Sequence, residues 1–130
     1  MSVNPAQPWL DKASEDLIVA RLVLAEQHFA HACFLSEQCI EKSFKAFLIA
    51  RTNNHPRTHK LVDLLNDCQI HDPGLGIFLP DCIVVDQYYV PTRYPDALPG
   101  TTATGTPSRI EAEEAIAAAE KILAAIRQRI

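Results

Sequence analysis

The sequence predicts an all-α protein, an antiparallel (up-and-down) bundle of four to five helices with a long Pro/Gly/Thr-rich loop before the last helix. Apolar residues recur at three- and four-residue steps in several long segments, and segments rich in Pro, Gly and Asn separate them. A chain of 130 residues that is 48% hydrophobic can bury one continuous core but not two. We therefore expect a single domain over residues 1–130, with residues 1–8 as a flexible tail and residues 90–107 as the loop.

The first two expected helices carry the longest apolar stripes. The first runs from about Trp9 to Gln27, with a stripe made of Trp9, Ala13, Leu17, Ala20 and Leu24. The second runs from about Ala30 to Arg51, and its stripe consists of Phe34, Leu35, Cys39, Ile40, Phe44, Phe47 and Leu48. Its opposite side carries Glu37, Glu41, Lys42 and Lys45. For any one of these charges, a solvated helix face is the first interpretation and a site is the second.

The remaining helices are shorter or less certain in type. A turn at TNNHPRT precedes a third helix that starts at Thr58 or His59 and ends near Cys68, and HDPGLG is expected to be a loop. Residues 77–89 contain β-branched residues that suit a strand, but the all-α context and Pro80 near the start favour a helix. Ser108 and Glu111 form a capping-box pattern at the start of the last helix. Its buried side is expected to hold Ile116, Ala119, Leu123, Ile126 and Ile130.

Charge and cysteine usage narrow the classes of function. The net charge of −4 argues against a protein that coats nucleic acid through its overall field, although a local basic patch is compatible with it. The four cysteines lack zinc-site spacing, so we expect buried thiols in a reducing compartment. No histidine pair has metal-ligand spacing with a carboxylate, and we expect neither a metal nor a cofactor. Without an apolar run of membrane length or signal-peptide features, a cytoplasmic location is expected.

The main site candidate is the segment that contains Arg93, Tyr94 and Asp96. An arginine fork can hold a phosphate through two hydrogen bonds, and a tyrosine ring can stack on a base. Tyr88 and Tyr89 are expected to add aromatic surface. An equally weighted alternative is that Arg93 forms an intramolecular salt bridge with Asp96 or Glu41 and pins the loop to the bundle.

Histidines close to arginines raise a second possibility, metal-independent cleavage of RNA. This reaction needs a group of near-neutral pKa to take a proton from the 2′-hydroxyl and a cation to stabilise the charge on the phosphate. His55 or His59 could take the proton, and Arg51, Arg57 or Arg93 could supply the charge. The preferred alternative is structural: His59 caps the third helix and His55 sits in a turn.

Three segments in order, SEQCIEKSFKAFLIA, THKLVDLL and TRYPD, make the chain resemble the HEPN domain (higher eukaryotes and prokaryotes nucleotide-binding), in a branch that carries TRYPD. The resemblance extends from Trp9 to the end. It implies a bundle of four or five helices, commonly a homodimer, often encoded with a minimal nucleotidyltransferase. Several members act as metal-independent ribonucleases in toxin–antitoxin pairs.

Ribonuclease-active members of that family characteristically carry an arginine and a histidine separated by four to six residues. Here three residues separate Arg51 from His55, seven separate Arg51 from His59, and Arg93 has no histidine after it, so we expect the usual spacing to be absent from this chain. We therefore expect a domain that binds a nucleotide or RNA phosphate in a cleft beside the second helix, through Arg93, Tyr94, Asp96, Lys45, Lys42, Glu41 and Tyr89. A ribonuclease with an atypical arrangement of Arg51, His55 or His59, and a noncatalytic protein-interaction module, are the two alternatives.

Overall fold

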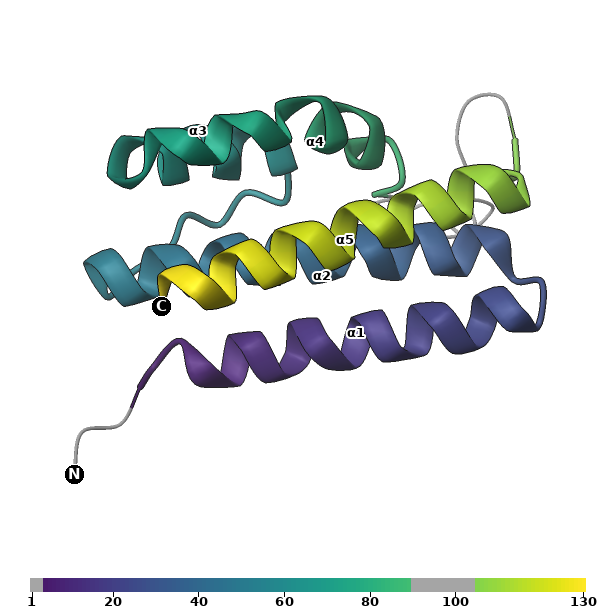
Figure 1. Cartoon of the computed structure of the whole chain (residues 1–130), viewed down its shortest axis with the longest axis horizontal. Helices are drawn as coiled ribbons and strands as arrows, with labels where there is room; N and C mark the ends of the chain where they lie inside the picture. Colours follow the sequence, from purple (N-terminus) through teal and green to yellow (C-terminus); the bar gives the residue numbers. More distant parts are fainter. Residues whose placement is uncertain (1–3, 90–104) are drawn as a thin grey trace.

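The computed structural model describes residues 4–89 and 105–130, which fold into five α-helices and one 3-10 helix (Figure 1). In chain order the elements are α1 (Gln7–Ala25), α2 (Phe29–Thr52), α3 (Leu61–His71), η1 (Pro73–Phe78), α4 (Leu79–Asp86) and α5 (Arg109–Arg129). This architecture confirms the predicted all-α bundle. Most of the loop expected at residues 90–107 lies outside the described residues, as do Arg93, Tyr94 and Asp96.

Helix α2 lies at the centre of the bundle and contacts α1, α3, α4 and α5 (Figure 1). α1 and α2 form an antiparallel hairpin, and α5 returns antiparallel to α1. Because neighbours cover α2 on several sides, its charged side is largely buried. Glu37, Glu41 and Lys45 are 0%, 5% and 4% exposed. The first interpretation of these charges, a solvated helix face, is therefore wrong for these three residues.

The start of α3 differs from the prediction. The helix begins at Leu61 rather than at Thr58 or His59, and His59 does not cap it. Its first amides are satisfied from α4, where the Asp86 carboxylate accepts hydrogen bonds from the backbone N–H groups of Leu61 (2.6 Å) and Val62 (3.1 Å). A carboxylate at this position also interacts favourably with the positive end of the helix dipole.

The segment HDPGLG contains a 3-10 helix in place of the expected loop. The Asp72 carboxylate accepts a hydrogen bond from the Gly74 N–H at 3.0 Å, and Pro73 stands at the first helical position. An acidic cap followed by proline favours a helical turn. This turn buries Leu75 and Phe78 against the core.

Helix α1 begins at Gln7, within the stretch expected as a tail, and Ala6 before it is fully buried. α5 opens with the predicted capping box: Ser108 Oγ accepts from the Glu111 N–H, and the Glu111 carboxylate accepts from the Ser108 N–H. Ile130 was expected on the buried side of α5, but it is 38% exposed because the helix ends there.

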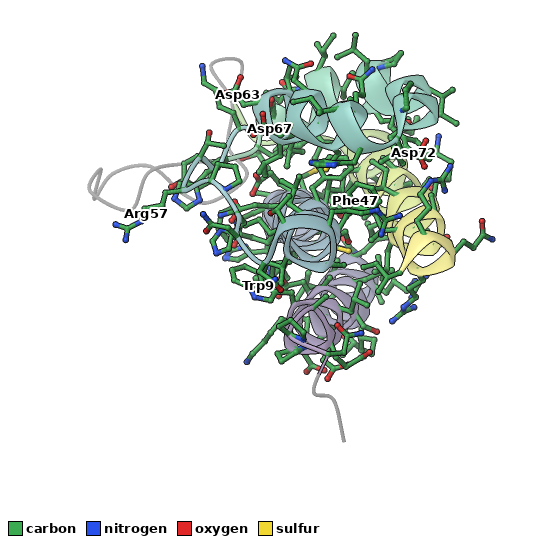
Figure 2. The ribbon with its side chains drawn as sticks, turned by 90° about the vertical axis from the view of Figure 1, so that its left-hand side faces the viewer. Trp9, Phe47, Arg57, Asp63, Asp67 and Asp72 are labelled. Atoms are coloured by element: carbon green, nitrogen blue, oxygen red, sulfur yellow. The ribbon has the colours of Figure 1, made fainter. Side chains whose placement is uncertain are left out.

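The core runs along the length of α2. Figure 2 looks down the bundle and shows Phe47 in the interior, with Trp9 and Arg57 toward one edge. All four cysteines are free and buried, as predicted. Among the described residues, no helix combines the length and the apolar character needed to cross a membrane.

Candidate functional site

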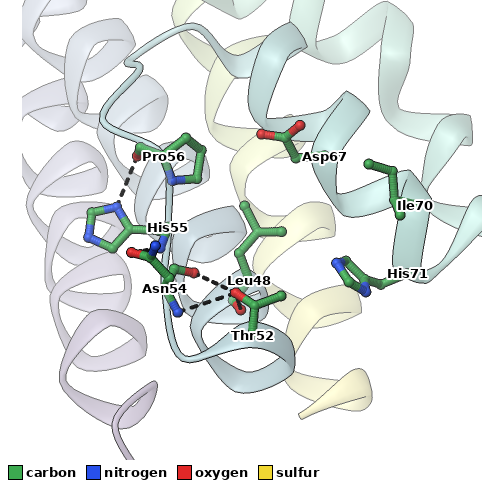
Figure 3. A pocket seen from close by; sticks show the side chains of 8 residues that line it. All are labelled: Leu48, Thr52, Asn54, His55, Pro56, Asp67, Ile70 and His71. Atoms are coloured by element: carbon green, nitrogen blue, oxygen red, sulfur yellow. Dashed lines mark hydrogen bonds between the residues drawn. The ribbon is translucent and has the colours of Figure 1, made fainter.

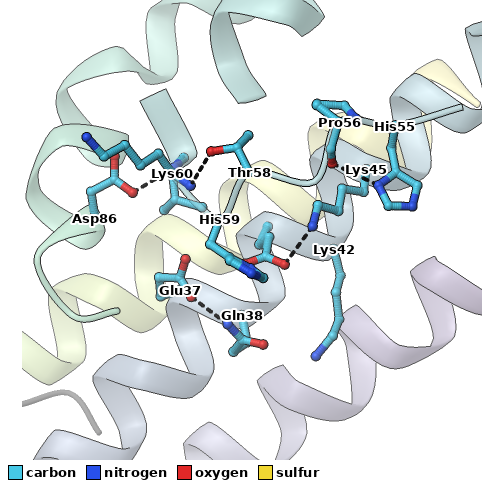
Figure 4. A network of polar contacts seen from close by, with 12 residues as sticks. Glu37, Gln38, Lys42, Lys45, His55, Pro56, Thr58, His59, Lys60 and Asp86 are labelled. Atoms are coloured by element: carbon cyan, nitrogen blue, oxygen red, sulfur yellow. Dashed lines mark hydrogen bonds and ion pairs between the residues drawn. The ribbon is translucent and has the colours of Figure 1, made fainter. Parts of the chain in front are cut away.

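A network of polar contacts extends from the middle of α2 to the segment before α3 (Figure 4). The Glu41 carboxylate joins its members. Lys45 Nζ donates to Glu41 Oε2 at 3.0 Å, and Glu41 Oε1 lies 3.1 Å from His59 Nδ1. The side chains of Glu41 and Lys45 are only 6% and 5% exposed, so their charges compensate each other in a nearly dry environment.

His59 is the solvent-facing member of this network. Its side chain is 49% exposed and stacks on the Tyr89 ring, with centroids 4.9 Å apart and planes 14° from parallel. A carboxylate accepts hydrogen bonds, so in the neutral imidazole Nδ1 carries the proton and Nε2 keeps its lone pair. The arrangement therefore leaves Nε2 available to accept a proton or a hydrogen bond from a ligand.

Neighbouring backbone contacts hold His59 in place. Thr58 Oγ1 accepts from the Lys60 N–H at 3.1 Å, and Asp86 anchors the first turn of α3 two residues beyond His59. Asp86 ends α4, three residues before Tyr89. The same carboxylate therefore ties together the two segments that carry the stacked rings.

An open depression of about 920 Å³ lies beside the stacked rings. This volume is typical of sites that take small ligands. Its walls come from the segment before α3, the first turn of α3 and the end of α4, and are formed by Thr58, His59, Lys60, Val62, Asp63, Ile83, Asp86, Gln87 and Tyr89.

Glu37 lies one turn before Glu41 on α2 and is fully buried. Gln38 Nε2 donates to Glu37 Oε1 at 2.7 Å, whereas Glu37 Oε2 has no hydrogen-bond partner among the described residues. Burial, and secondarily the nearby Glu41 charge, raises the pKa of the Glu37 carboxyl to about 9. Glu37 is therefore protonated at neutral pH, whereas Glu41 is paired with a lysine.

A second aromatic contact lies on the other side of Lys45. The rings of Trp9 and His55 meet edge to face with centroids 4.6 Å apart, and Lys45 Nζ is 6.0 Å from the Trp9 centroid. Lys42 turns toward α1, where its Nζ lies 2.5 Å from Asp16 Oδ2. The sequence places Trp9 only in an apolar stripe, and its half-buried position beside two lysines could not be inferred from periodicity.

A smaller hollow of about 220 Å³ lies between the end of α2 and α3 (Figure 3). Its walls are formed by Leu48, Thr52, Asn54, His55, Pro56, Asp67, Ile70 and His71. The Thr52 hydroxyl donates to Leu48 O and accepts from the Asn54 N–H, and His55 Nδ1 lies 2.9 Å from Pro56 O. These local bonds close the turn after α2.

Within residues 4–89 and 105–130, no group of three His, Cys, Asp or Glu side chains is arranged to hold a metal ion.

Two other residues considered from the sequence, Arg51 and Tyr88, do not contribute to the surface around His59. The Arg51 guanidinium donates to Arg129 O and lies over the Phe47 ring, so these contacts direct it toward α5 and the core rather than toward His55 or His59. Tyr88 is 1% exposed and adds no aromatic surface, contrary to the prediction. Burial raises the pKa of its hydroxyl, which interacts with the Cys33 thiol.

A further arginine–histidine pair has the spacing typical of ribonuclease-active members. Six residues separate Arg21 from His28, which falls within the four-to-six range, and the expectation that this spacing is absent is wrong for this pair. Arg21 forms an exposed ion pair with Glu120 (2.7 Å), and His28 is the N-cap residue of α2. Neither side chain lines the depression beside Tyr89. The spacing therefore exists in this chain, where Arg21 is held in an ion pair and the His28 side chain makes no capping hydrogen bond to α2.

Comparison with known proteins agrees with this fold. The family model of the HEPN domain matches residues 6–129. Among curated proteins, the chain is 26% identical over 134 residues to one from Methanocaldococcus jannaschii named "Putative toxin MJ1304", covering 97% of this chain and 88% of that protein.

Solved structures give the same result. TT1696 from Thermus thermophilus is 35% identical with a TM-score of 0.81, covering 98% of this chain and 100% of that one. ST0689, described as an archaeal HEPN homologue, is 29% identical with a TM-score of 0.73, covering 95% and 96%. A HEPN domain protein from Thermotoga maritima is 26% identical with a TM-score of 0.72, covering 92% and 94%. The chain therefore belongs to the HEPN domain family.

Proposed function

We propose that this HEPN domain binds a nucleotide or an RNA phosphate on the face formed by α2, the segment before α3 and the end of α4. The observation that carries the proposal is the His59–Tyr89 stack, held by a buried carboxylate and open to a depression of about 920 Å³. A preformed aromatic surface with an exposed imidazole edge suits a base or a phosphate oxygen.

Positive charge is available at the same place. Lys60 lines the depression, and exposed Arg57 lies three residues before it. Arg93 follows Tyr89 by four residues in the sequence and lies outside the described residues. These charges support phosphate binding through Arg93, with Tyr94 as a stacking ring and Asp96 as its anchor.

The proposed biological setting is a toxin–antitoxin-type or related system in the cytoplasm, with a minimal nucleotidyltransferase as partner and the chain as a homodimer. Similarity to the protein named "Putative toxin MJ1304" supports the setting. Exposed apolar residues on η1 and α4 that do not line the depression support an interface: Ile77, Leu79 and Val84 are 73%, 38% and 46% exposed.

The test is a binding titration. Purified wild-type protein is titrated with each ribonucleoside monophosphate and with a fluorescently labelled single-stranded RNA, beside His59→Ala, Arg93→Ala and two controls. His31→Ala removes an exposed histidine near the other end of α2, and Arg127→Ala removes an exposed arginine from α5. Circular dichroism confirms that each variant is folded. We expect binding to weaken at least tenfold in the first two variants and to stay within twofold in the controls. Equal affinity in all five proteins, or no binding by the wild type, contradicts the proposal.

A metal-independent ribonuclease is the second candidate, and the Glu41–His59 contact specifically favours it. With Nδ1 bonded to a buried carboxylate, His59 Nε2 has the orientation of a general base that removes the 2′-hydroxyl proton. In this reaction the 2′-oxygen attacks the adjacent phosphorus, the bond from phosphorus to the 5′-oxygen of the next nucleotide breaks, and that oxygen takes a proton from water, which gives a cyclic phosphate and a 5′-hydroxyl end. RNA cleavage by the wild type that is lost in a folded His59→Ala variant would establish this activity.

A further inference from the structure

Trp9 lines an open apolar hollow at the start of α1. The hollow has a volume of about 380 Å³ and is formed by Pro8, Trp9, Lys12 and Lys42. Trp9 is half-buried, with one ring edge against His55, and it opens on the hollow together with two lysine side chains. A large aromatic ring next to cationic side chains is the composition of a base-stacking site for single-stranded nucleic acid.

This hollow is connected to the His59–Tyr89 stack through a short series of contacts. Lys45 Nζ lies 6.0 Å from the Trp9 ring centroid and 3.0 Å from Glu41 Oε2. Glu41 Oε1 in turn contacts His59 Nδ1. One buried ion pair thus separates two aromatic pairs, Trp9–His55 and His59–Tyr89. Figure 4 shows Lys42, Lys45, His55 and His59 on this one side of α2.

One mononucleotide cannot contact both aromatic pairs. A single base that stacks at the His59–Tyr89 pair leaves the Trp9 hollow empty, because the Glu41–Lys45 ion pair and the aliphatic part of Lys45 lie between them. A strand of several nucleotides can place one base at each pair. Its phosphates then pass near Lys12, which is exposed, and Lys42, which is partly neutralised by Asp16.

We propose that the Trp9 hollow is a second base-stacking subsite and that the ligand is single-stranded RNA of several nucleotides rather than a mononucleotide. This inference rests on the proposed function, since the first base occupies the His59–Tyr89 pair. Stacking on an aromatic ring contributes about 1–3 kcal/mol per base, which corresponds to a change in affinity of about fivefold to 150-fold. Removal of the Trp9 ring therefore weakens binding of an oligonucleotide and leaves mononucleotide affinity unchanged.

The chain contains one tryptophan, so its emission reports on this subsite alone. We expect hexauridylate to quench the Trp9 fluorescence of the wild-type protein, and uridine monophosphate to bind without quenching it. Trp9→Ala should weaken binding of labelled hexauridylate at least fivefold, whereas Trp9→Phe should retain most of the affinity. Lys12→Ala should weaken it twofold to threefold, and the matched control Lys121→Ala on α5 should not change it. Circular dichroism checks that each variant is folded.

The experiment distinguishes a failure of the Trp9 subsite from a failure of the proposed function. If hexauridylate and uridine monophosphate both bind but the emission of Trp9 is unchanged and Trp9→Phe and Lys12→Ala bind normally, the Trp9 subsite is refuted and the proposed function stands. If neither ligand binds the wild-type protein, the proposed function fails together with the subsite. Because the quenching is measured on the wild-type protein, the test remains decisive even if Trp9→Ala does not fold.

Discussion

Replacing Glu37 with glutamine tests whether a buried carboxyl in α2 is protonated in the folded protein. Glutamine has nearly the same shape, carries no charge at any pH and can still accept the hydrogen bond from Gln38. Burial and the Glu41 charge raise the Glu37 pKa from 4.5 to about 9. In the unfolded chain the carboxyl has its ordinary pKa and is ionised at neutral pH.

The sign of the pH dependence follows from this difference. The folded wild-type protein retains the proton on Glu37 where the unfolded chain has released it, so the free energy of unfolding falls as the pH rises above the unfolded pKa. The contribution of Glu37 is complete below that pKa and is lost by the folded pKa. Each pH unit between the two is worth about 1.4 kcal/mol. Between about pH 5 and about pH 8, the wild type should lose up to about 4 kcal/mol relative to Glu37→Gln.

The assay is urea unfolding followed by far-ultraviolet circular dichroism, with wild type and Glu37→Gln measured at each pH. Titrations common to both proteins cancel in the difference. Glu113→Gln, an exposed substitution on α5, controls for the loss of one carboxyl as such. A wild-type minus Glu37→Gln difference that stays constant across this range would mean that Glu37 is ionised in the folded state, and the burial argument would be refuted.

Three further substitutions test the caps of α3 and α5 and the buried ion pair of the site. Asp86→Ala removes the acceptor for two amides of α3 and should cost about 2 kcal/mol of unfolding free energy, measured by urea titration; a cost below about 0.5 kcal/mol would show that α3 needs no such cap. Ser108→Ala removes half of the α5 capping box and should cost about 1 kcal/mol, measured in the same way, and an unchanged midpoint would contradict the box. Lys45→Met leaves the Glu41 charge buried and should cost about 3 kcal/mol, most of which Glu41→Gln in the same chain should restore; additive losses in the double variant would argue against a coupled pair.

The helices were predictable from local patterns because each carries its own signals. The capping box at Ser108 and the apolar stripes of α1, α2 and α5 depend only on neighbouring residues, and they are found where the sequence indicates them. The start of α3 was misplaced because its cap, Asp86, comes from a residue 25 positions away. A cap of this kind leaves no sequence signature at the helix that it stabilises.

The candidate site was predicted only in part, for a related reason. Glu41 and Lys45 are four residues apart, so their pairing follows from helix geometry, and the structure gives a 3.0 Å contact. Their burial does not follow from it, because it depends on the central position of α2 among four other helices. The Trp9–His55 and His59–Tyr89 contacts join segments that are distant in sequence, which periodicity cannot bring together.

The most direct test of the central claim is a map of the ligand-binding surface in solution. Two-dimensional ¹H–¹⁵N nuclear magnetic resonance spectra are recorded while unlabelled single-stranded RNA is added to the ¹⁵N-labelled wild-type chain. The account predicts that the largest amide shifts cluster at residues 41–45, 58–62 and 86–89, around the Glu41 network and the His59–Tyr89 stack, with a second group at residues 9–12 beside the Trp9 hollow. Shifts confined to Ile77, Leu79 and Val84, which do not line the depression, or no shifts at all, would contradict it.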